Sequence, residues 1–226
     1  MHEIVQRLIR IENQIKEESA KLKIPTEAKI IAIGKTFNLD TIIPLVEHGH
    51  LHFGENKVQE AKLKWSNIKK EKPNLNLHFV GKLQTNKAKD VIKLFDYVHS
   101  LENIKQVEVL SKYEKKLKKK LKYFIQINIG YESQKSGIEP KDTKNFLEDC
   151  INKYDLNIVG LMCLPPNDDF SGKYFQEIKD LKISLPRHHQ NQVIELSMGM
   201  SNDYISAISY GSTYIRIGTK IFGERK

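Results

Sequence analysis

The feature that most constrains this sequence is an eightfold alternation of short apolar runs with longer amphipathic stretches. The runs are rich in β-branched residues and end at glycine, proline or polar residues, as buried parallel strands do. The stretches between them repeat apolar residues at helical spacing. Strands alternating with helices need crossover connections, which predicts a parallel sheet. We expect strands at residues 28–33, 50–53, 76–80, 97–100, 123–129, 158–164, 193–196 and 214–217.

Eight strand–helix units predict a (β/α)8 barrel of the TIM type. The runner-up is an open doubly wound sheet, and closure is favoured because the sequence ends with the eighth unit. Ile4, Leu8, Ile11 and Ile15 predict an extra amphipathic helix before the first strand. At 226 residues, without internal repeats or a long linker, the chain is expected to form one domain over 1–226.

The composition is that of a basic globular protein. Lys and Arg total 37 against 28 Asp and Glu, a net charge of +9, which would permit binding of nucleic acid or acidic ligands. Most lysines lie on predicted helix faces, however, such as the run at 115–122, and no nucleic-acid-binding motif is present. Solvated helix faces and no nucleic-acid partner are therefore expected.

Two cysteines, Cys150 and Cys163, share no metal or redox spacing, so neither a zinc site nor a disulfide framework is expected. Lone cysteines are typical of a reducing compartment. The acidic N-terminal stretch does not resemble a signal peptide, and no apolar run has the length of a membrane span. We expect a cytoplasmic protein without a membrane partner.

Polar residues gather where the predicted strands end. A lone lysine there, such as Lys35 after the first strand, is more often on its way to solvent. In a closed barrel, however, the carboxyl ends of the strands form one mouth, where active sites lie. The polar ends are Lys35, Asn56, the turn at 84–86, Asn128, Ser197, Ser201, Arg216 and Thr219.

The segments after strands seven and eight have features of an anion site. Gly199 and Gly218 would let backbone N–H groups approach a ligand, and Ser201 and Thr219 add hydroxyl donors. Ser201 stands where a short helix at 202–210 is expected to begin. It is equally an ordinary helix N-cap, with the glycines serving as turns. The residues leave both interpretations open.

Closure of the barrel would bring this anion site beside Lys35. Burial and the charge of Arg216 would favour the free amine, which could form a Schiff base with an aldehyde. Pyridoxal 5′-phosphate (PLP) fits these parts, with its aldehyde on Lys35, its phosphate at Ser201, Gly218 and Thr219, and its ring nitrogen at Arg216. Arginine does not give up its proton, so the ring would be a poor electron sink. This argues against transamination and β-elimination.

Seven motifs occur in order along the chain, at 32–36 (AIGKT), 52–56 (HFGEN), 78–87 (HFVGKLQTNK), 135–137 (KSG), 160–162 (GLM), 196–203 (LSMGMSND) and 216–225 (RIGTKIFGER). Together they resemble the pyridoxal phosphate homeostasis protein family, from the first strand to the C-terminus. The resemblance implies a fold like the N-terminal domain of alanine racemase, with PLP held on Lys35 and Asn56 among the cofactor-binding residues. It also implies no established catalytic activity, no catalytic residue and a role in binding, buffering or delivering PLP.

The sequence departs from the family pattern at two positions. The family often has serine before the Schiff-base lysine and histidine after the glycine of the third-strand motif, where this chain has Gly34 and Lys82. Gly34 removes a side chain beside the linkage but leaves the linkage itself. The sequence stops at Lys226, before the point that many relatives reach, so nothing is carried over from a longer tail.

Three rival functions stay open beside a PLP-binding protein without turnover. A PLP-dependent amino-acid racemase needs a second acid–base group on the opposite ring face, and the sequence offers no nameable candidate. The others are a Schiff-base aldolase acting on a sugar phosphate and a basic nucleic-acid-binding module. Delivery of PLP to apo PLP-dependent enzymes is suggested by Lys35, Lys82 and Lys135 at the mouth. We expect a monomer.

Overall fold

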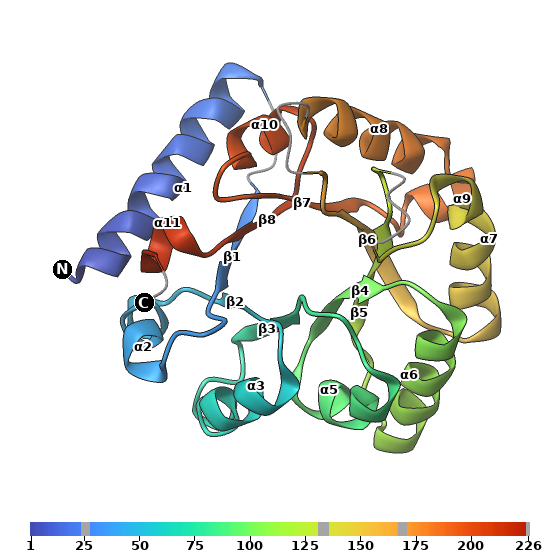
Figure 1. Ribbon diagram of the computed structural model, residues 1–226, viewed down its shortest axis with the longest axis horizontal. Coiled ribbons are helices and arrows are strands. Elements are labelled where there is room, and N and C mark those ends of the chain that lie inside the picture. Colours follow the sequence, from blue (N-terminus) through green and yellow to red (C-terminus); the bar gives the residue numbers. More distant parts are fainter. Residues whose placement is uncertain (24–27, 131–135, 167–170, 225–226) are drawn as a thin grey trace.

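The computed structural model describes residues 1–23, 28–130, 136–166 and 171–224. Its centre is a closed barrel of parallel strands in the order β1 to β8, in which β8 pairs with β1 (Figure 1). The predicted (β/α)8 barrel is confirmed. The strands are β1 (Lys29–Ile33), β2 (His52–Glu55), β3 (Asn76–Phe79), β4 (Tyr97–Leu101), β5 (Lys122–Ile127), β6 (Asn157–Cys163), β7 (Glu195–Met200) and β8 (Tyr214–Ile217).

Helices surround the barrel on its outside (Figure 1). Local signals set several of their ends: the Asn38 side chain caps α2, and Gly49 ends it in the left-handed conformation. Within the described residues, no helix combines the length and hydropathy that crossing a bilayer requires. The helices are α1 (Glu3–Lys21), α2 (Leu39–His48), α3 (Val58–Trp65), α4 (Ile68–Glu71), α5 (Ala88–Leu94), α6 (Ile104–Leu117), α7 (Thr143–Glu148), α8 (Ser171–Ser184), α9 (Arg187–Gln190), α10 (Tyr204–Ser209) and α11 (Thr219–Phe222).

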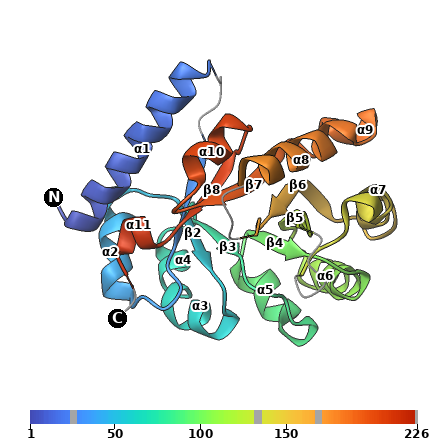
Figure 2. The ribbon, with the colours of Figure 1, turned by 45° about the horizontal axis from the view of Figure 1, so that its top comes forward.

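The extra N-terminal helix is also confirmed. α1 packs against α2, α10 and α11, beside the junction of the first and last strands (Figures 1 and 2). Its apolar stripe, including Ile4, Leu8, Ile11 and Ile15, is buried as the spacing predicts. α1 therefore covers the seam where the barrel closes.

The predicted ends of β7 were wrong. The strand begins at Glu195 and runs on to Met200, because a bulge opposite β8 lets the chain continue past Ser197. Gly199 has φ +90°, and a Cβ there would lie 2.6 Å from the Cβ of Ala207. This glycine therefore permits close packing of α10, while the approach of its N–H to a ligand stays a prediction.

The short helix after β7 also begins later than predicted. α10 starts at Tyr204, and Ser201 lies in the turn that precedes it. Asp203 closes this turn, because its Oδ1 accepts a hydrogen bond of 2.6 Å from the Met200 N–H. Ser201 is therefore not the N-cap of the helix. The second strand is similarly displaced, from the predicted 50–53 to His52–Glu55.

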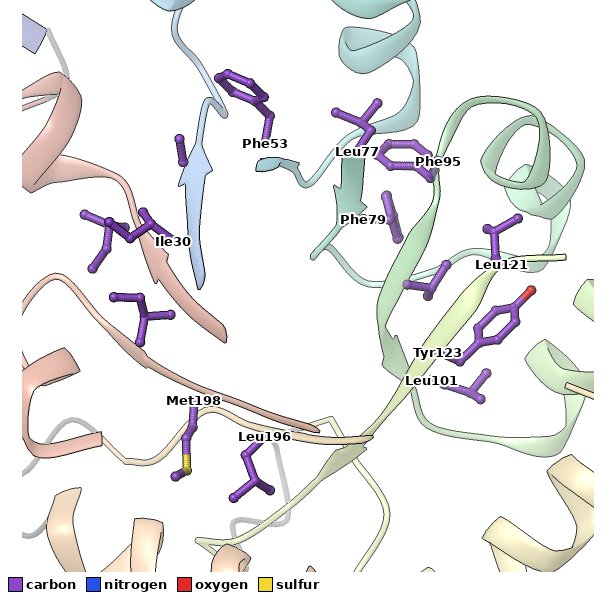
Figure 3. Packing of buried hydrophobic residues seen from close by; sticks show 14 of the residues in the cluster. Ile30, Phe53, Leu77, Phe79, Phe95, Leu101, Leu121, Tyr123, Leu196 and Met198 are labelled. Atoms are coloured by element: carbon purple, nitrogen blue, oxygen red, sulfur yellow. The ribbon is translucent and has the colours of Figure 1, made fainter. Parts of the chain in front are cut away.

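Most of the core lies between the strands and the helices. Side chains such as Phe53, Leu77 and Leu196 point from the strands toward the surrounding helices (Figure 3). On α3, Trp65 is fully buried against this layer. The alternation of side chains along each strand sends every second residue outward in this way.

The barrel interior is more polar than is usual. An apolar cluster inside it comprises Ile31, Ile33, Tyr97, Phe124, Met162 and Tyr214. Barrel interiors are dominated by branched aliphatic residues. Here the buried set also includes His78, His99, Ser197 and Arg216. Inside the barrel, hydrogen bonding as well as side-chain volume therefore limits which residues can be accommodated.

Acidification is expected to destabilise the fold below about pH 6.5. Burial lowers the pKa of His50 and His52 to about 4 and that of His78 and His99 well below the usual value. The unfolded chain binds these protons below about pH 6.5 while the folded chain does not, so stability is present above that pH and lost below it. Each histidine contributes at most about 1.4 kcal/mol per pH unit. Urea unfolding at about pH 7.5 and about pH 5 measures the loss; an unchanged free energy of unfolding would contradict it.

Candidate functional site

Lys35 lies in a turn two residues after β1 and is half-buried. The peptide groups on both sides of it are held by α3: Lys64 Nζ donates to the Gly34 carbonyl at 2.9 Å, and the Thr36 N–H donates to Glu60 Oε1 at 2.8 Å. Thr36 has φ +71°, a conformation that β-branched residues rarely adopt. The two bonds thus stabilise a strained turn that presents Lys35.

A buried ionic network supports this turn. Lys64 Nζ lies 2.6 Å from Glu60 Oε1 and 3.1 Å from Glu55 Oε1, which also accepts from Trp65 Nε1 at 2.9 Å. Burial raises the pKa of the fully buried Glu55, and the bonds from Trp65 and Lys64 oppose that shift. Burial alone would raise the pKa of Glu60, but its bonds to Lys64 and the Thr36 N–H outweigh it and lower the pKa. Sequence analysis missed this network, although the i,i+4 spacing of Glu60 and Lys64 was visible.

Gly34 has a clear role in the same network. A Cβ at this position would lie 2.8 Å from Ile42 Cδ1 and 3.2 Å from Glu55 Oε1. The missing side chain would therefore point toward α2 and Glu55. Gly34 therefore leaves room for the Glu55 carboxylate.

Arg216 is buried within β8 and faces the barrel interior. Its Nη1 donates to the carbonyl and to the hydroxyl of Ser197, both at 2.7 Å, and its Nη2 donates to the Cys163 carbonyl at 2.9 Å. Burial lowers the pKa of this guanidinium, although arginine stays charged at any physiological pH. Of its five N–H groups, at least two remain without a partner among the described residues.

The predicted site residues follow four neighbouring strands. Ser201 follows β7. Arg216 lies in β8, and Gly218 and Thr219 follow that strand. Lys35 follows β1 and Asn56 follows β2. A Cβ on Gly218 would lie 3.6 Å from Ile33, which places the end of β8 beside the end of β1. The structure therefore gathers the residues on one side of the barrel mouth. How each of them contacts a ligand stays a prediction.

Lys82 lines a cavity of about 280 Å³ next to Asn56, between the segments that follow β2 and β3. Lys57, Gln84 and Lys87 also line it, so the cavity is strongly basic. Lys135, the other lysine expected at the mouth, lies outside the described residues. A larger cavity of about 460 Å³ lies on the outer surface between α3 and α5, away from the mouth.

The mouth has polar groups that match the functional groups of PLP. Asn56 Oδ1 is buried without a hydrogen-bond partner among the described residues, and buried polar atoms of this kind call for one. Arg216 has N–H groups without a partner, and within the described residues no side chain caps the N-terminus of α11. These donors and acceptors suit a ligand that carries an anion, a hydroxyl and a ring nitrogen.

Replacing Lys64 with methionine is expected to loosen the Lys35 turn. The substitution removes the donor to the Gly34 carbonyl and leaves the buried Glu55 carboxylate without its cationic partner. We expect the free energy of unfolding to fall by about 3–5 kcal/mol. Urea unfolding of the ligand-free protein measures the loss. Lys62→Met is the matched control, since Lys62 on the same helix makes an exposed contact of 3.5 Å with Asp90. Equal stability of the two variants would contradict the role of Lys64.

Comparisons with known proteins identify the family. The family described as alanine racemase, N-terminal domain, matches residues 7–226. The pyridoxal phosphate homeostasis protein of Pasteurella multocida is 37% identical over 230 residues, covering 98% of this chain and 97% of the relative. The protein of the same name from Escherichia coli K12 is 30% identical and covers 100% and 98%.

Solved structures agree with the fold. PipY of Synechococcus elongatus, solved with PLP bound, is 31% identical, with a TM-score of 0.78 covering 92% of this chain and all of PipY. Alanine racemase of Clostridium difficile shares the fold at 12% identity, with a TM-score of 0.69 covering 94% of this chain and 57% of the racemase. On these matches the chain belongs to the pyridoxal phosphate homeostasis protein family, and its barrel is an alanine racemase N-terminal domain.

Proposed function

We propose that this protein binds PLP at the barrel mouth, held as a Schiff base on Lys35, and buffers or delivers it without turnover chemistry. The observation that carries the proposal is the half-buried Lys35 on a turn held by α3, next to the strand that bears the buried Arg216. The names of the relatives and the PLP bound to PipY support the same ligand.

Each residue of the site has a proposed task. Lys35 holds the cofactor aldehyde, while Ser201, Gly218 and Thr219 bind its phosphate with hydroxyl and backbone donors. Arg216 donates to the ring nitrogen, and Asn56 binds a polar group at the ring edge. A bound PLP supplies an electrophilic carbonyl carbon. The protein residues orient it and keep water from the linkage.

The position of the interior tyrosines supports binding over racemisation. Tyr97 and Tyr214 each begin their strand, at the end of the barrel opposite the mouth. Their hydroxyls lie 3.4 Å apart and accept from Lys122 at 3.1 Å and Lys29 at 3.3 Å. These two tyrosines therefore lie at the wrong end of the barrel for the second acid–base group that a racemase needs.

We further propose a cytoplasmic monomer that supplies PLP to apo PLP-dependent enzymes and binds neither nucleic acid nor membranes. Cys150 and Cys163 are free and buried, and burial raises the pKa of each thiol to about 12. Such inert thiols suit a reducing compartment.

Spectroscopy and chemical trapping of the purified protein test the proposal. We expect visible absorbance from bound PLP and, after borohydride reduction, a pyridoxyl group on the peptide that contains Lys35. Absence of both after PLP is added would favour the aldolase alternative. Incubation of the holoprotein with single-enantiomer amino acids should leave their optical purity unchanged. Racemisation at ordinary enzymatic rates would contradict a function without turnover.

Delivery needs a separate measurement. An apo PLP enzyme should regain activity faster with the holoprotein than with the same concentration of free PLP. A PLP scavenger added to both reactions distinguishes direct transfer from release into solution. Equal rates in the two reactions would rule out direct transfer.

A further inference from the structure

A row of three histidines crosses the barrel interior and ends on Arg216. His52 Nδ1 lies 3.0 Å from His78 Nε2, and His78 Nδ1 lies 2.9 Å from His99 Nε2. His99 Nδ1 lies 2.9 Å from Ser197 Oγ, which accepts from Arg216 Nη1 at 2.7 Å. We call these three residues the histidine row. None of them was expected to act from the sequence.

Strand register builds the row. In β2, β3 and β4 the inward-facing positions include His52, His78 and His99. His78 pairs with Gly54, two residues beyond His52, and Tyr97 pairs with His78, so each histidine lies higher than the one before it. The row therefore climbs from the start of β2 toward the mouth and then crosses to β7.

The rings of the row are held in place by stacking. His78 stacks on Tyr97 with 4.2 Å between centroids and 14° between planes. His99 stacks on Phe124 with 4.2 Å and 15°. His78 and His99 have no measurable exposure, and burial lowers the pKa of both, so they are neutral at physiological pH. A neutral histidine offers one donor and one acceptor nitrogen.

The hydrogen bonds favour one direction along the row. Arg216 only donates, so Ser197 Oγ receives its N–H. In the described part of the chain, His99 Nδ1 is the acceptor found for the Ser197 hydroxyl proton. His99 then carries its own proton on Nε2 and donates to His78 Nδ1, and His78 Nε2 donates to His52 Nδ1. This direction makes all three rings Nε2–H tautomers.

The two ends of the row lie in different surroundings. Arg216 is at the mouth, with N–H groups left for a ligand. His52 is half-buried and lines a cavity of about 270 Å³ with Glu12, Lys16 and Lys29, at the end of the barrel opposite the mouth. The last ring of the row can thus place its Nε2–H toward a polar cavity.

We propose that the histidine row positions Arg216 for the cofactor by keeping the lone pair of Ser197 Oγ turned toward the guanidinium. His99 Nδ1 accepts a hydrogen bond from the Ser197 hydroxyl, and His78 and His52 act by fixing the tautomer of His99. Without His99 Nδ1 as acceptor, the Ser197 hydroxyl can turn its proton toward Arg216. The guanidinium then loses one of the hydrogen bonds that fix its orientation. The inference rests on the proposed binding of PLP. His99 is a positioning residue here and touches no ligand.

Two nearly isosteric variants separate this role from simple packing. In His99→Asn the side-chain oxygen takes the place of Nδ1 and accepts a hydrogen bond from Ser197. In His99→Gln the side-chain amide reaches the Nε2 position, where its N–H donates to His78. Each variant loses one hydrogen bond of the row, so the ligand-free proteins should be similarly destabilised. We expect PLP affinity close to wild type for His99→Asn and about tenfold weaker for His99→Gln. Equal affinities of the two variants would overturn the proposal.

Imidazole nitrogen NMR of the ligand-free wild type gives a test that needs neither a variant nor PLP. We expect His52, His78 and His99 as neutral Nε2–H tautomers; a proton on Nδ1 of His99 would overturn the proposal. If the wild type fails to bind PLP, the proposed function falls while the tautomers can still be as expected. If it binds PLP and the tautomers differ, only the histidine row falls.

Discussion

Lys35→Ala is expected to abolish the borohydride-stable pyridoxyl adduct completely. The side chain supplies the amine, and its neighbours on the turn, Gly34 and Thr36, are held through backbone groups that the substitution leaves intact. Phosphate and ring contacts should still hold some PLP, so we expect weaker but measurable binding. Mass spectrometry after borohydride reduction measures the adduct, and equilibrium dialysis measures the remaining affinity.

The control for this experiment is Lys82→Ala, which removes a lysine of the neighbouring cavity but leaves Lys35 in place. That variant should keep the adduct on Lys35. The free energy of unfolding should change by less than about 1 kcal/mol in both, as is usual for lysines that are not fully buried. An adduct of wild-type yield on another lysine in Lys35→Ala would refute the assignment.

Arg216→Met is expected to lower both stability and PLP affinity. Its three hydrogen bonds go to buried acceptors of Ser197 and Cys163, which methionine cannot satisfy. Leaving the buried partners of a charged group without a hydrogen bond lowers the free energy of unfolding by about 3–5 kcal/mol. Urea unfolding of the ligand-free protein gives the stability, and PLP titration gives the affinity.

Arg216→Lys separates the charge from the geometry of the guanidinium. Lysine keeps the positive charge but lacks the planar fork that reaches Ser197, Cys163 and the mouth together. We expect intermediate stability and an affinity as weak as in Arg216→Met. Wild-type PLP affinity in either variant would exclude Arg216 from the site.

The architecture was accessible from the sequence because it depends on periodicity. Apolar runs at regular spacing determine where strands and helices form, and parallel strands joined by helices leave few topologies. Errors arose where a local detail overrode periodicity. Gly199 was taken as part of a loop, yet its positive φ permits a bulge that carries β7 on to Met200.

The candidate site was only partly accessible. Lys35, Ser201 and Thr219 could be proposed from the sequence because the strand ends of a parallel barrel meet at one mouth. The network of Glu55, Glu60 and Lys64 was missed, since it depends on how α3 packs back against the turn after β1. Such a contact between a helix and a preceding loop has no signature in a single sequence.

The sequence by itself determined the strand–helix alternation, the residues at the strand ends and, through its motifs, the family. The tertiary structure alone decided what lies inside the barrel. His52, His78 and His99 sit on three strands, and Ser197 and Arg216 sit on two more. Strand tilt and register bring them within hydrogen-bond distance, and those depend on closure of the whole sheet rather than on any local run of residues.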